Sequence, residues 1–575
     1  MIMNSKKTVL PLFVLFVFAL SAGCASQPVE FEVSREVEVE QFIEVEVTRE
    51  VMVEVEVPQV VIVTPVSIDS ETESPRETTD ETAADTTSNP EPVVEAVPAD
   101  QPSTLRLAHE LIWAGDEVLD PYAATRFAEY SLLAHERLVK LDGAGNIAPV
   151  LATGWESNGD GTVWTFALRD DVVFHNGQPM RPADVAYSLE RMIDPTIGST
   201  LQPVLQQMAS ITVDGNNQIV IGLSAPNVEF PMLLTDPRAV ILQADDGGAP
   251  AADEIGTGPF ALESLNIEGI TQLLAHVNYW GGRPGVDQVE LIAIPDSATR
   301  IDAMLAEQID ILDRIPNEQK TQFANANEFG LQSIPTGDWR GFAMRTDTAP
   351  FDNAAVRQAI RLAADRQGLV DAVLGGAGTV ACDTPVWSGD RYHKPIECGQ
   401  DLEQAKALLA TAGYPNGIDL TIRTSPLDPY WPALLAVYQQ QATPAGIRLN
   451  IVEEPAETFW TNTWLIEPFI TTSWNERPAP LILNEAWRSG APWNETYWNN
   501  ADFDALLDQA AAEPDLSLRR GFYWQAQQTL WDSGGAFIPF HLNQTRVIST
   551  CIAGVQPISA EHIDFAKIVK TPNCN

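Results

Sequence analysis

Hydrophobic and polar positions alternate with two different periods along the chain. Period two, typical of strands, runs through residues 104–112 (TLRLAHELI) and twice through residues 163–175 (VWTFALRDDVVFH). Helical spacing marks residues 182–193, 401–415 and 517–535, and residues 353–376 are predicted as one helix that ends at two glycines. Because strands and helices mix throughout, the pattern predicts an α/β fold.

The first 23 residues have the pattern of an export signal. Lys6 and Lys7 precede an apolar run of 14 residues, residues 9–22, and small residues stand just before Cys24. A spanning helix needs about 20 apolar residues, so we predict a signal peptide at 1–23 rather than an anchor helix. Cys24 after Ala-Gly resembles the lipobox of bacterial lipoproteins, although Ser21 stands where an aliphatic residue is usual. The resemblance implies acylation of Cys24; the alternative is an ordinary cleaved signal.

Residues 24–103 form a second distinctive segment. Its first half alternates valine with glutamate, and its second half is rich in Ser, Thr, Glu and Pro. Residues 25–103 hold 20 acidic and 3 basic residues. Such a composition cannot bury a core, so we predict an extended or disordered tether behind a lipid anchor.

Composition excludes several classes of function. The 575 residues carry a formal charge of −45, whereas nucleic-acid binding needs a basic surface, so no nucleic-acid partner is expected. The chain has no G-x-S-x-G motif, no phosphate loop and no paired-histidine or C-x-x-C metal motif, which predicts no enzyme, no metal and no cofactor.

Four cysteines follow Cys24 in two local pairs. An even number in an exported chain predicts disulfides, and we expect Cys382 with Cys398 and Cys551 with Cys574. The alternatives are a pairing of Cys382 with Cys551, and free thiols if export is wrong.

Five ordered segments resemble one known family. Residues 155–192 (WESNGDGTVWTFALRDDVVFHNGQPMRPADVAYSLERM) are similar to the signature of family 5 extracellular solute-binding proteins, the peptide, oligopeptide and nickel receptors of ABC importers. The segments IGTGPFALES, NYWGGRPGVDQVELIAIPDSATRIDAMLAEQIDI, FAMRTDTAPFDNAAVRQAIRLAADRQGLVDAVLGG and DLEQAKALLATAGYPNG follow in the family's order. The resemblance covers about residues 104–575.

The resemblance implies a two-lobed periplasmic-binding-protein fold of type II with ligand enclosed between the lobes. Lobe I would be residues 104–345, with an extra subdomain at about 131–255, and residues 537–575 would return to it. Lobe II would be residues 346–536, with the crossings near residues 343–345 and 538–541. We keep the names lobe I and lobe II for these ranges.

Candidate ligand contacts combine aromatic and charged residues. Of 15 tryptophans, 10 lie between Trp387 and Trp531, and an aromatic face beside a cleft serves a ligand well. Peptide-binding relatives have an aspartate shortly after the position of Trp474, but this chain has Glu476 and Arg477. An inward Glu476 would suit a cationic ligand group and an inward Arg477 an anionic one. The predicted ligand-binding residues, three of them expected in loops (Trp113, Trp387 and Trp474), are Trp113, Arg340, Trp387, Trp474, Glu476 and Arg477.

The resemblance implies a receptor that captures a peptide or another small polar solute by hinge closure. Its partners would be that ligand, an ABC importer permease and, through the lipid anchor, the outer face of the cell membrane; a monomer is expected. The alternatives are an oligosaccharide or metal-chelate receptor of the same fold, or a surface hydrolase.

Overall fold

The computed structural model describes residues 102–109, 118–123, 127–143, 145–215, 217–245, 254–315, 317–324, 326–555, 557–559 and 562–571. All of these belong to the second of two units, residues 94–575. The predicted signal peptide, Cys24, nearly all of the tether, Trp113 and Cys574 lie outside the described residues.

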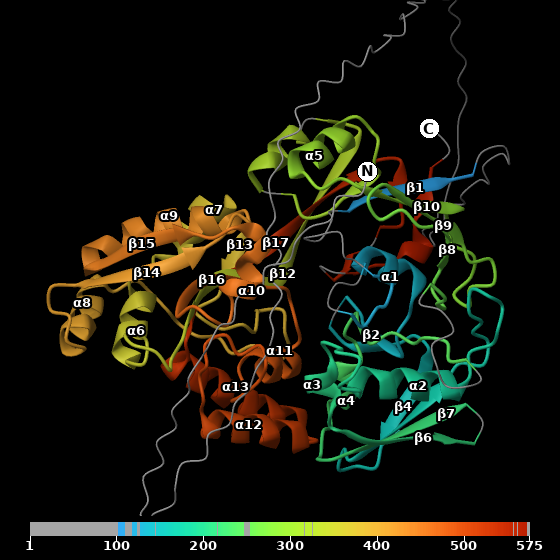
Figure 1. The fold of residues 1–575 in the computed structure, drawn as a ribbon, viewed down its shortest axis with the longest axis horizontal. Helices are drawn as coiled ribbons and strands as arrows, with labels where there is room; N and C mark the ends of the chain where they lie inside the picture. Colours follow the sequence, from blue (N-terminus) through green and yellow to red (C-terminus); the bar gives the residue numbers. More distant parts are fainter. Residues whose placement is uncertain are drawn as a thin grey trace, which may run out of the picture. The chain divides into compact units, whose positions relative to one another are not determined.

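An eleven-stranded mixed sheet runs through this unit (Figure 1). Its order is β15-β14-β16-β12-β17-β11-β1-β10-β9-β8, and β13 pairs with β17. The strands are β1 (Thr104–His109), β8 (Phe260–Ser264), β9 (Ile270–Ala275), β10 (Gln288–Ala293), β11 (Ile311–Leu312), β12 (Phe329–Met344), β13 (Gly378–Val380), β14 (Ile418–Thr424), β15 (Ile447–Glu453), β16 (Phe469–Trp474) and β17 (Ala536–Ser549).

The long strands β12 and β17 connect the two ends of the sheet. They are antiparallel, with Phe329 opposite Ser549 and Ala343 opposite Ala536, and their register shifts between Pro335 and Trp339. After that shift, residues 339–344 of β12 also pair with β16. Near the other end of the β12–β17 pair, Val547 and Ile548 of β17 pair with β11. These pairings lead us to propose the junction between the lobes near residues 335–339, earlier than the predicted 343–345.

In lobe II, helices cover both sides of the strands β14 and β15. Figure 1 shows α7 (Arg366–Leu374) and α9 (Tyr430–Ala442) on one side of these strands and α6 (Ala354–Leu362) and α8 (Leu402–Thr411) on the other. Apolar residues at helical spacing bury their side chains against the sheet, which makes one continuous core.

A second group of helices in lobe II surrounds a core rich in aromatic residues. Trp339, Trp487, Trp498 and Tyr523 are buried there. The helices around this core are α11 (Ala479–Ala486), α12 (Ala501–Ala512) and α13 (Leu516–Ser533). Three short helices complete this part of the chain: η2 (Thr443–Ala445), which packs in the core around β14 and β15, η3 (Ala456–Thr458) and α10 (Phe459–Asn462).

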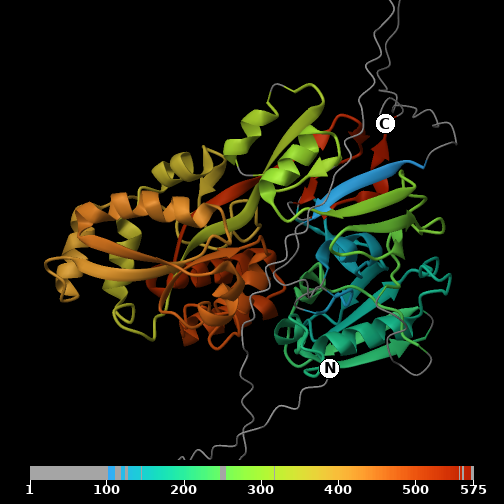
Figure 2. The same cartoon turned by 45° about the horizontal axis from the view of Figure 1, so that its top comes forward.

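Within the range predicted for the extra subdomain of lobe I, a four-stranded antiparallel sheet, β4-β5-β7-β6, is covered by α2 (Figure 2). Trp164, Phe166 and Phe174 of the signature are buried in its core. Its elements are β2 (Val139–Leu141), β3 (Ile147–Pro149), β4 (Ala152–Ser157), β5 (Val163–Leu168), α2 (Pro182–Ile193), α3 (Gln202–Leu205), β6 (Met208–Asp214), β7 (Gln218–Leu223) and α4 (Phe230–Leu233).

The remaining elements complete lobe I around β1 and β8–β11. They are α1 (Ala128–Ala134), α5 (Ser297–Leu305), η1 (Asn317–Gln322), β18 (Ile552–Ala553), β19 (Pro557–Ser559), β20 (His562–Ile563), η4 (Phe565–Lys567) and β21 (Val569–Lys570). No helix in the described part of the chain combines the length and apolar character needed to cross a membrane.

Two predicted elements differ from the structure. The single helix expected over 353–376 is two helices, because the Asp365 side chain accepts a hydrogen bond from Gly368 N and caps α7, which ends the preceding turn. The second strand expected within 163–175 is absent from the structure at that place: Val173 makes only an isolated bridge with Pro179. A short period-two run therefore packed into the core without a ladder partner.

Gly256 and Gly258, just before β8, lie in close backbone contact with the end of α1. A Cβ on Gly256 would lie 1.8 Å from the carbonyl oxygen of Ala134, and Gly258 N donates to that oxygen at 2.9 Å. Gly256 N donates to Nδ1 of His175, whose Nε2 lies 3.0 Å from Gly258 O. The glycines thus serve close backbone approach rather than a phosphate, and His175 has a structural role.

Candidate ligand-binding site

The end of β16 brings several predicted site residues to the middle of β12. Trp339 lies opposite Trp474, and Arg340 lies opposite Ser473, in an antiparallel ladder. The segment after β16 therefore begins beside the register shift of β12. Trp474 is the last residue of strand β16, so its predicted loop position was wrong.

The side chains of Trp387 and Glu476 pack next to each other over Gly337. A Cβ at Gly337 would lie 2.5 Å from Cδ1 of Trp387 and 2.9 Å from Cγ of Glu476, so both side chains cover this glycine. Gly337 N donates to Oε2 of Glu476 at 2.9 Å, and Glu476 N donates to Oδ1 of Asp338 at 2.8 Å. Two predicted site residues are thus adjacent, and the Glu476 carboxylate is bound to the main chain.

Arg477 belongs to a network of four charges that joins the two lobes. Its Nη1 lies 3.3 Å from Oδ2 of Asp236, and its Nε lies 3.3 Å from Oε2 of Glu485. Arg238 completes the network, with Nη2 at 2.6 Å from Asp236 and 3.5 Å from Glu485. Asp236 and Arg238 come from lobe I, and Arg477 and Glu485 come from lobe II. We call these four residues the Arg477 network.

Burial and charge act against each other within this network. Burial disfavours ionisation of Asp236, but Arg238 and then Arg477 outweigh it and hold the pKa of Asp236 well below its usual value. For Glu485 burial dominates and raises the pKa, although both arginines oppose it. The side chain of Arg477 is 20% exposed, whereas the side chains of the other three members are at most 5% exposed. Arg477 is therefore the most solvent-exposed member of the network.

Aromatic rings border the Arg477 network. The Arg477 guanidinium lies 5.7 Å from the ring centres of both Trp474 and Trp493, and those rings are 5.9 Å apart. Arg238 lies 5.6 Å from Trp493. An arginine beside indole faces gains cation–π attraction, and such faces also suit a bound ligand.

A buried carboxylate fixes the orientation of Trp474. Glu495 accepts hydrogen bonds from Nε1 of Trp474 at 3.1 Å, Nε1 of Trp464 at 2.7 Å and Oγ1 of Thr472 at 2.8 Å. Burial raises the pKa of Glu495, and these three donors lower it. Trp474 is only 8% exposed, so most of its ring packs in the lobe II core.

Arg340 of β12 pairs with Asp428 of lobe II. Its Nε forms an ion pair with Asp428, and its Nη1 donates to Trp339 O at 3.2 Å. Both charged side chains are mostly buried. Arg340 thus lies close to the other predicted site residues, opposite Ser473 of β16. Its positive charge is balanced by Asp428.

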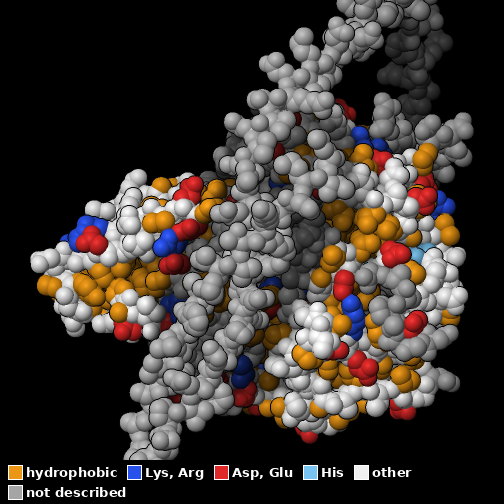
Figure 3. All heavy atoms as spheres, in the orientation of Figure 1, with side chains coloured by type: hydrophobic (Ala, Val, Ile, Leu, Met, Phe, Trp, Pro, Cys, Tyr) orange, Lys and Arg blue, Asp and Glu red, His pale blue; other side chains and the backbone are white. Residues whose placement is uncertain are grey.

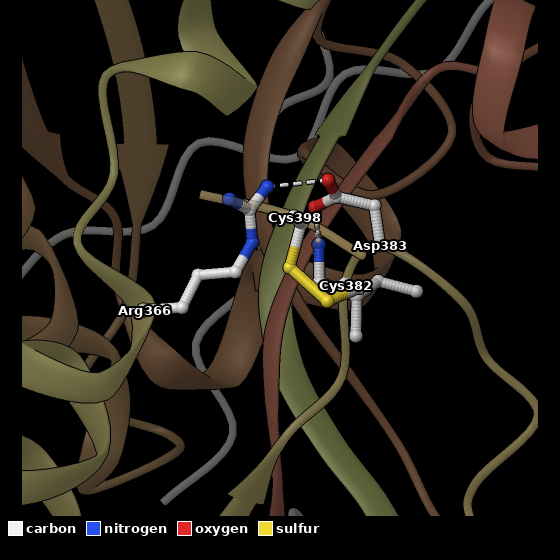
Figure 4. The surroundings of a disulfide bond; sticks show 5 residues. Arg366, Cys382, Asp383 and Cys398 are labelled. Carbon is white, nitrogen blue, oxygen red and sulfur yellow. Dashed lines mark hydrogen bonds and ion pairs between the residues drawn. A yellow bond between two sulfur atoms is a disulfide. The ribbon is translucent and has the colours of Figure 1, made fainter. Parts of the chain in front are cut away.

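The loop that carries Trp387 is closed by a disulfide between Cys382 and Cys398. Figure 4 shows this bond next to Asp383, which pairs with Arg366 of α7. Asp383 also accepts a hydrogen bond from Ile538 N at 3.0 Å, which ties the loop to β17. Cys551 is disulfide-bonded too; its pairing with Cys574 stays a prediction, since Cys574 lies outside the described residues.

Two hollows lie away from this site. One of about 510 Å³ is lined by Asp170, Arg181 and Asn217 on the lobe I subdomain. The second, about 90 Å³, is lined by residues that include Ser131, Glu136 and Tyr279. Among the described residues no group of three or more His, Cys, Asp or Glu side chains could hold a metal ion.

The partners of Arg477 were missed from the sequence. Asp236 and Arg238 are two positions apart, which could have indicated a local ion pair. Their approach to Arg477, more than 200 residues later, has no sequence signal.

Figure 3 shows acidic, basic and apolar side chains interspersed on the described part of the visible face.

Comparison with known proteins identifies the class. Residues 146–506, more than half of the chain, match the bacterial extracellular solute-binding proteins, family 5 Middle. The chain belongs to this family, whose members are non-enzymatic solute-binding proteins of ABC importers. It has the mixed α/β fold of periplasmic binding proteins, as predicted.

Particular relatives show the range of ligands in the family. The chain is 28% identical over 455 residues to heme-binding protein A of Haemophilus influenzae, covering 70% of this chain and 80% of that protein. It is 25% identical over 445 residues to glutathione-binding protein GsiB of Escherichia coli K12, covering 72% and 84%. The structure of the binding protein AgaA with agropinic acid, from A. tumefaciens R10, superposes with a TM-score of 0.71 at 22% identity, covering 81% and 98%.

Proposed function

We propose that the chain captures a short peptide, or another small polar solute that carries both cationic and anionic groups, for uptake through an ABC permease. The observation that carries this proposal is the Arg477 network, in which two arginines and two carboxylates meet between the lobes beside two indole rings. The relative named for glutathione supports it, since glutathione is a tripeptide with ammonium and carboxylate groups.

The distances within the network favour exchange of partners at Arg477. Arg238 is 2.6 Å from Asp236, whereas Arg477 is 3.3 Å from Asp236 and from Glu485. A ligand carboxylate could therefore take the more exposed Arg477 in a bidentate pair, and a ligand ammonium could face Glu485. Trp474 and Trp493 would cover the apolar part of the ligand.

Binding would couple to closure of the lobes. Asp236 and Arg238 belong to lobe I, and Arg477 and Glu485 belong to lobe II, so a ligand that contacts all four binds the closed arrangement better than the open one. The ligand shifts the equilibrium by that differential affinity. The permease would then recognise the closed arrangement.

Calorimetry with glutathione, dialanine, heme, a nickel–histidine complex and maltotriose tests the ligand class. We expect binding of glutathione or dialanine, and at least a tenfold loss of affinity in Arg477→Ala. Arg448→Ala, which removes an exposed arginine paired with Asp419, is the matched control and should bind as wild type does. Binding of maltotriose alone, or equal affinity in both variants, would reject the proposal.

We also propose that the mature chain is anchored to the outer face of the cell membrane through acylated Cys24. The support is the signal-like segment that ends at Gly23 and the acidic segment that follows. Metabolic labelling with a fatty-acid analogue should mark wild type and not Cys24→Ser. Equal label in both would mean that the signal is an ordinary cleaved one.

A further inference from the structure

A second set of contacts joins the lobes at Glu229, just before α4 in the lobe I subdomain. The Glu229 carboxylate is 7% exposed. It accepts hydrogen bonds from the Tyr392 hydroxyl and, at 2.9 Å, from the Tyr523 hydroxyl. The Arg519 Nε lies 3.6 Å from it. All three partners belong to lobe II, so this buried carboxylate depends on the other lobe for its hydrogen bonds.

The three partners are held in place by one another. The rings of Tyr392 and Tyr523 are 4.5 Å apart, and Arg519 Nε donates to the Tyr392 hydroxyl at 2.8 Å. Gln527, one turn after Tyr523 on α13, donates to Tyr392 O at 2.7 Å. The acceptor from lobe I therefore meets a preformed set of donors.

Neighbouring contacts extend this junction. Val228 N donates to Ala511 O at 2.8 Å, which continues the junction to α12. Next to Tyr392, Arg391 Nη2 donates to Gly145 O at 2.6 Å and to Oδ1 of Asn146 at 3.0 Å. None of these residues belongs to the Arg477 network, so the junction is chemically separate from the candidate ligand site.

We infer that Glu229, Tyr392, Arg519 and Tyr523 form a latch that holds the two lobes together independently of ligand contacts. We call these residues the Glu229 latch. In the closed arrangement its carboxylate is satisfied by the opposite lobe, and in an open one by water. Removing the donors while keeping the carboxylate leaves a buried charge with too few partners, which penalises only the closed arrangement.

The consequence for binding is uniform across ligands. If only the closed arrangement binds tightly, the apparent dissociation constant rises as the closed fraction falls, by the same factor for every ligand. A residue that touches the ligand would instead change affinity differently for different ligands. This inference assumes the two-lobed closure of the proposed function but not its ligand class.

Distance measurements without ligand test the latch directly. Asp214 and Glu403 are exposed residues of lobe I and lobe II, and each is replaced by cysteine and carries a nitroxide label. Double electron–electron resonance then measures the distance between the labels in the mature chain that also carries Cys24→Ser. We expect the ratio of closed to open molecules to fall at least tenfold in the Tyr392→Phe, Tyr523→Phe double variant. An unchanged distance distribution in the folded variant would overturn the inference.

Glu136→Gln is the matched control. Glu136 is also a buried carboxylate held by a tyrosine hydroxyl, at 2.8 Å from Tyr279, and by the Trp280 indole, but all of these residues lie in lobe I. It should keep the wild-type distances, and opening in this control would overturn the inference. If the double variant does not fold, Glu229→Gln, which keeps the shape and removes the charge, should shift the distances the same way by a smaller factor; no shift would overturn the latch.

Measurements of ligand affinity test the latch and the proposed ligand class separately. The dissociation constants of glutathione and dialanine should rise by equal factors in the latch variant, and unequal factors would assign these residues to specificity instead. If neither compound binds wild type, the proposed ligand class fails, while the distance measurement still decides the latch.

Discussion

The Arg477 network and the Glu229 latch both join lobe I to lobe II, but their chemistry differs. The network contains two charges of each sign, and Arg477 is partly exposed with ion-pair distances of 3.3 Å. The latch has one carboxylate, two phenol donors and one more distant arginine. A partly exposed arginine beside aromatic faces suits exchange with a ligand, whereas neutral directional donors suit contacts between the two lobes.

Loss of a charge from the network should have the largest effect on stability. Asp236→Ala leaves Arg238 buried without its main partner, which we expect to lower the free energy of unfolding by about 3–5 kcal/mol. Urea denaturation of the ligand-free protein measures this. Asp419→Ala, in an exposed pair on β14, should leave the midpoint unchanged. A cost for Asp236→Ala no larger than that of Asp419→Ala would mean that the network is not electrostatically coupled.

Glu136 gives a pH reference for a buried carboxylate inside one lobe. Burial raises the pKa of Glu136 to about 7, against its ordinary value of 4.5. Between these values the unfolded chain is ionised while the folded chain keeps its proton, so stability falls as pH rises. The total loss is about 3 kcal/mol, complete near pH 7.

Comparison of Glu136→Gln with wild type isolates this contribution. Denaturation between pH 4 and pH 8 should show that wild type loses stability relative to the variant as pH rises across the window from about 4.5 to about 7. Parallel curves for the two proteins would contradict the raised pKa of Glu136. The variant thereby shows whether a buried carboxylate costs stability even without an interlobe role.

The disulfide loop lies near both regions, because it carries Tyr392 of the Glu229 latch and also Trp387, which packs over Gly337 beside Glu476, the residue before Arg477. Replacing Cys382 and Cys398 with serine frees a closed loop of 15 intervening residues, and the chain-entropy relation gives a loss of about 3 kcal/mol. Thermal unfolding measures the loss, and the label distances described above should lengthen as Tyr392 is released. A lower melting temperature with unchanged distances would separate the loop from the latch.

Trp474 should show the smallest effect. Trp474→Phe removes the indole donor to Glu495 but keeps an aromatic ring, and we expect a loss of about 1–2 kcal/mol in unfolding free energy. Trp498→Phe, in the same core but without a bond to Glu495 among the described contacts, is the comparison. If glutathione binds, its affinity should fall in Trp474→Phe more than in Trp498→Phe; equal affinity would assign Trp474 to the core alone.

The sequence by itself determined the local elements and the fold class. The boundaries of α2 follow from Pro182 and the apolar spacing after it. Trp164 and Phe166 occupy a buried core because alternate positions of β5 face the same side of the sheet. The break at Asp365 was missed, since a capping aspartate inside an apolar helical pattern is decided by a single hydrogen bond.

Only the tertiary structure decided which charges meet. Arg477 and Glu476 were recognisable as candidates, but Glu476 bonds to Gly337 N and Arg477 pairs with Asp236, which no local pattern predicts. Glu229 gave no signal at all, because its three partners lie between 163 and 294 residues away along the chain. Periodicity reports which face of an element is buried, whereas long-range ion pairs depend on how those faces are brought together.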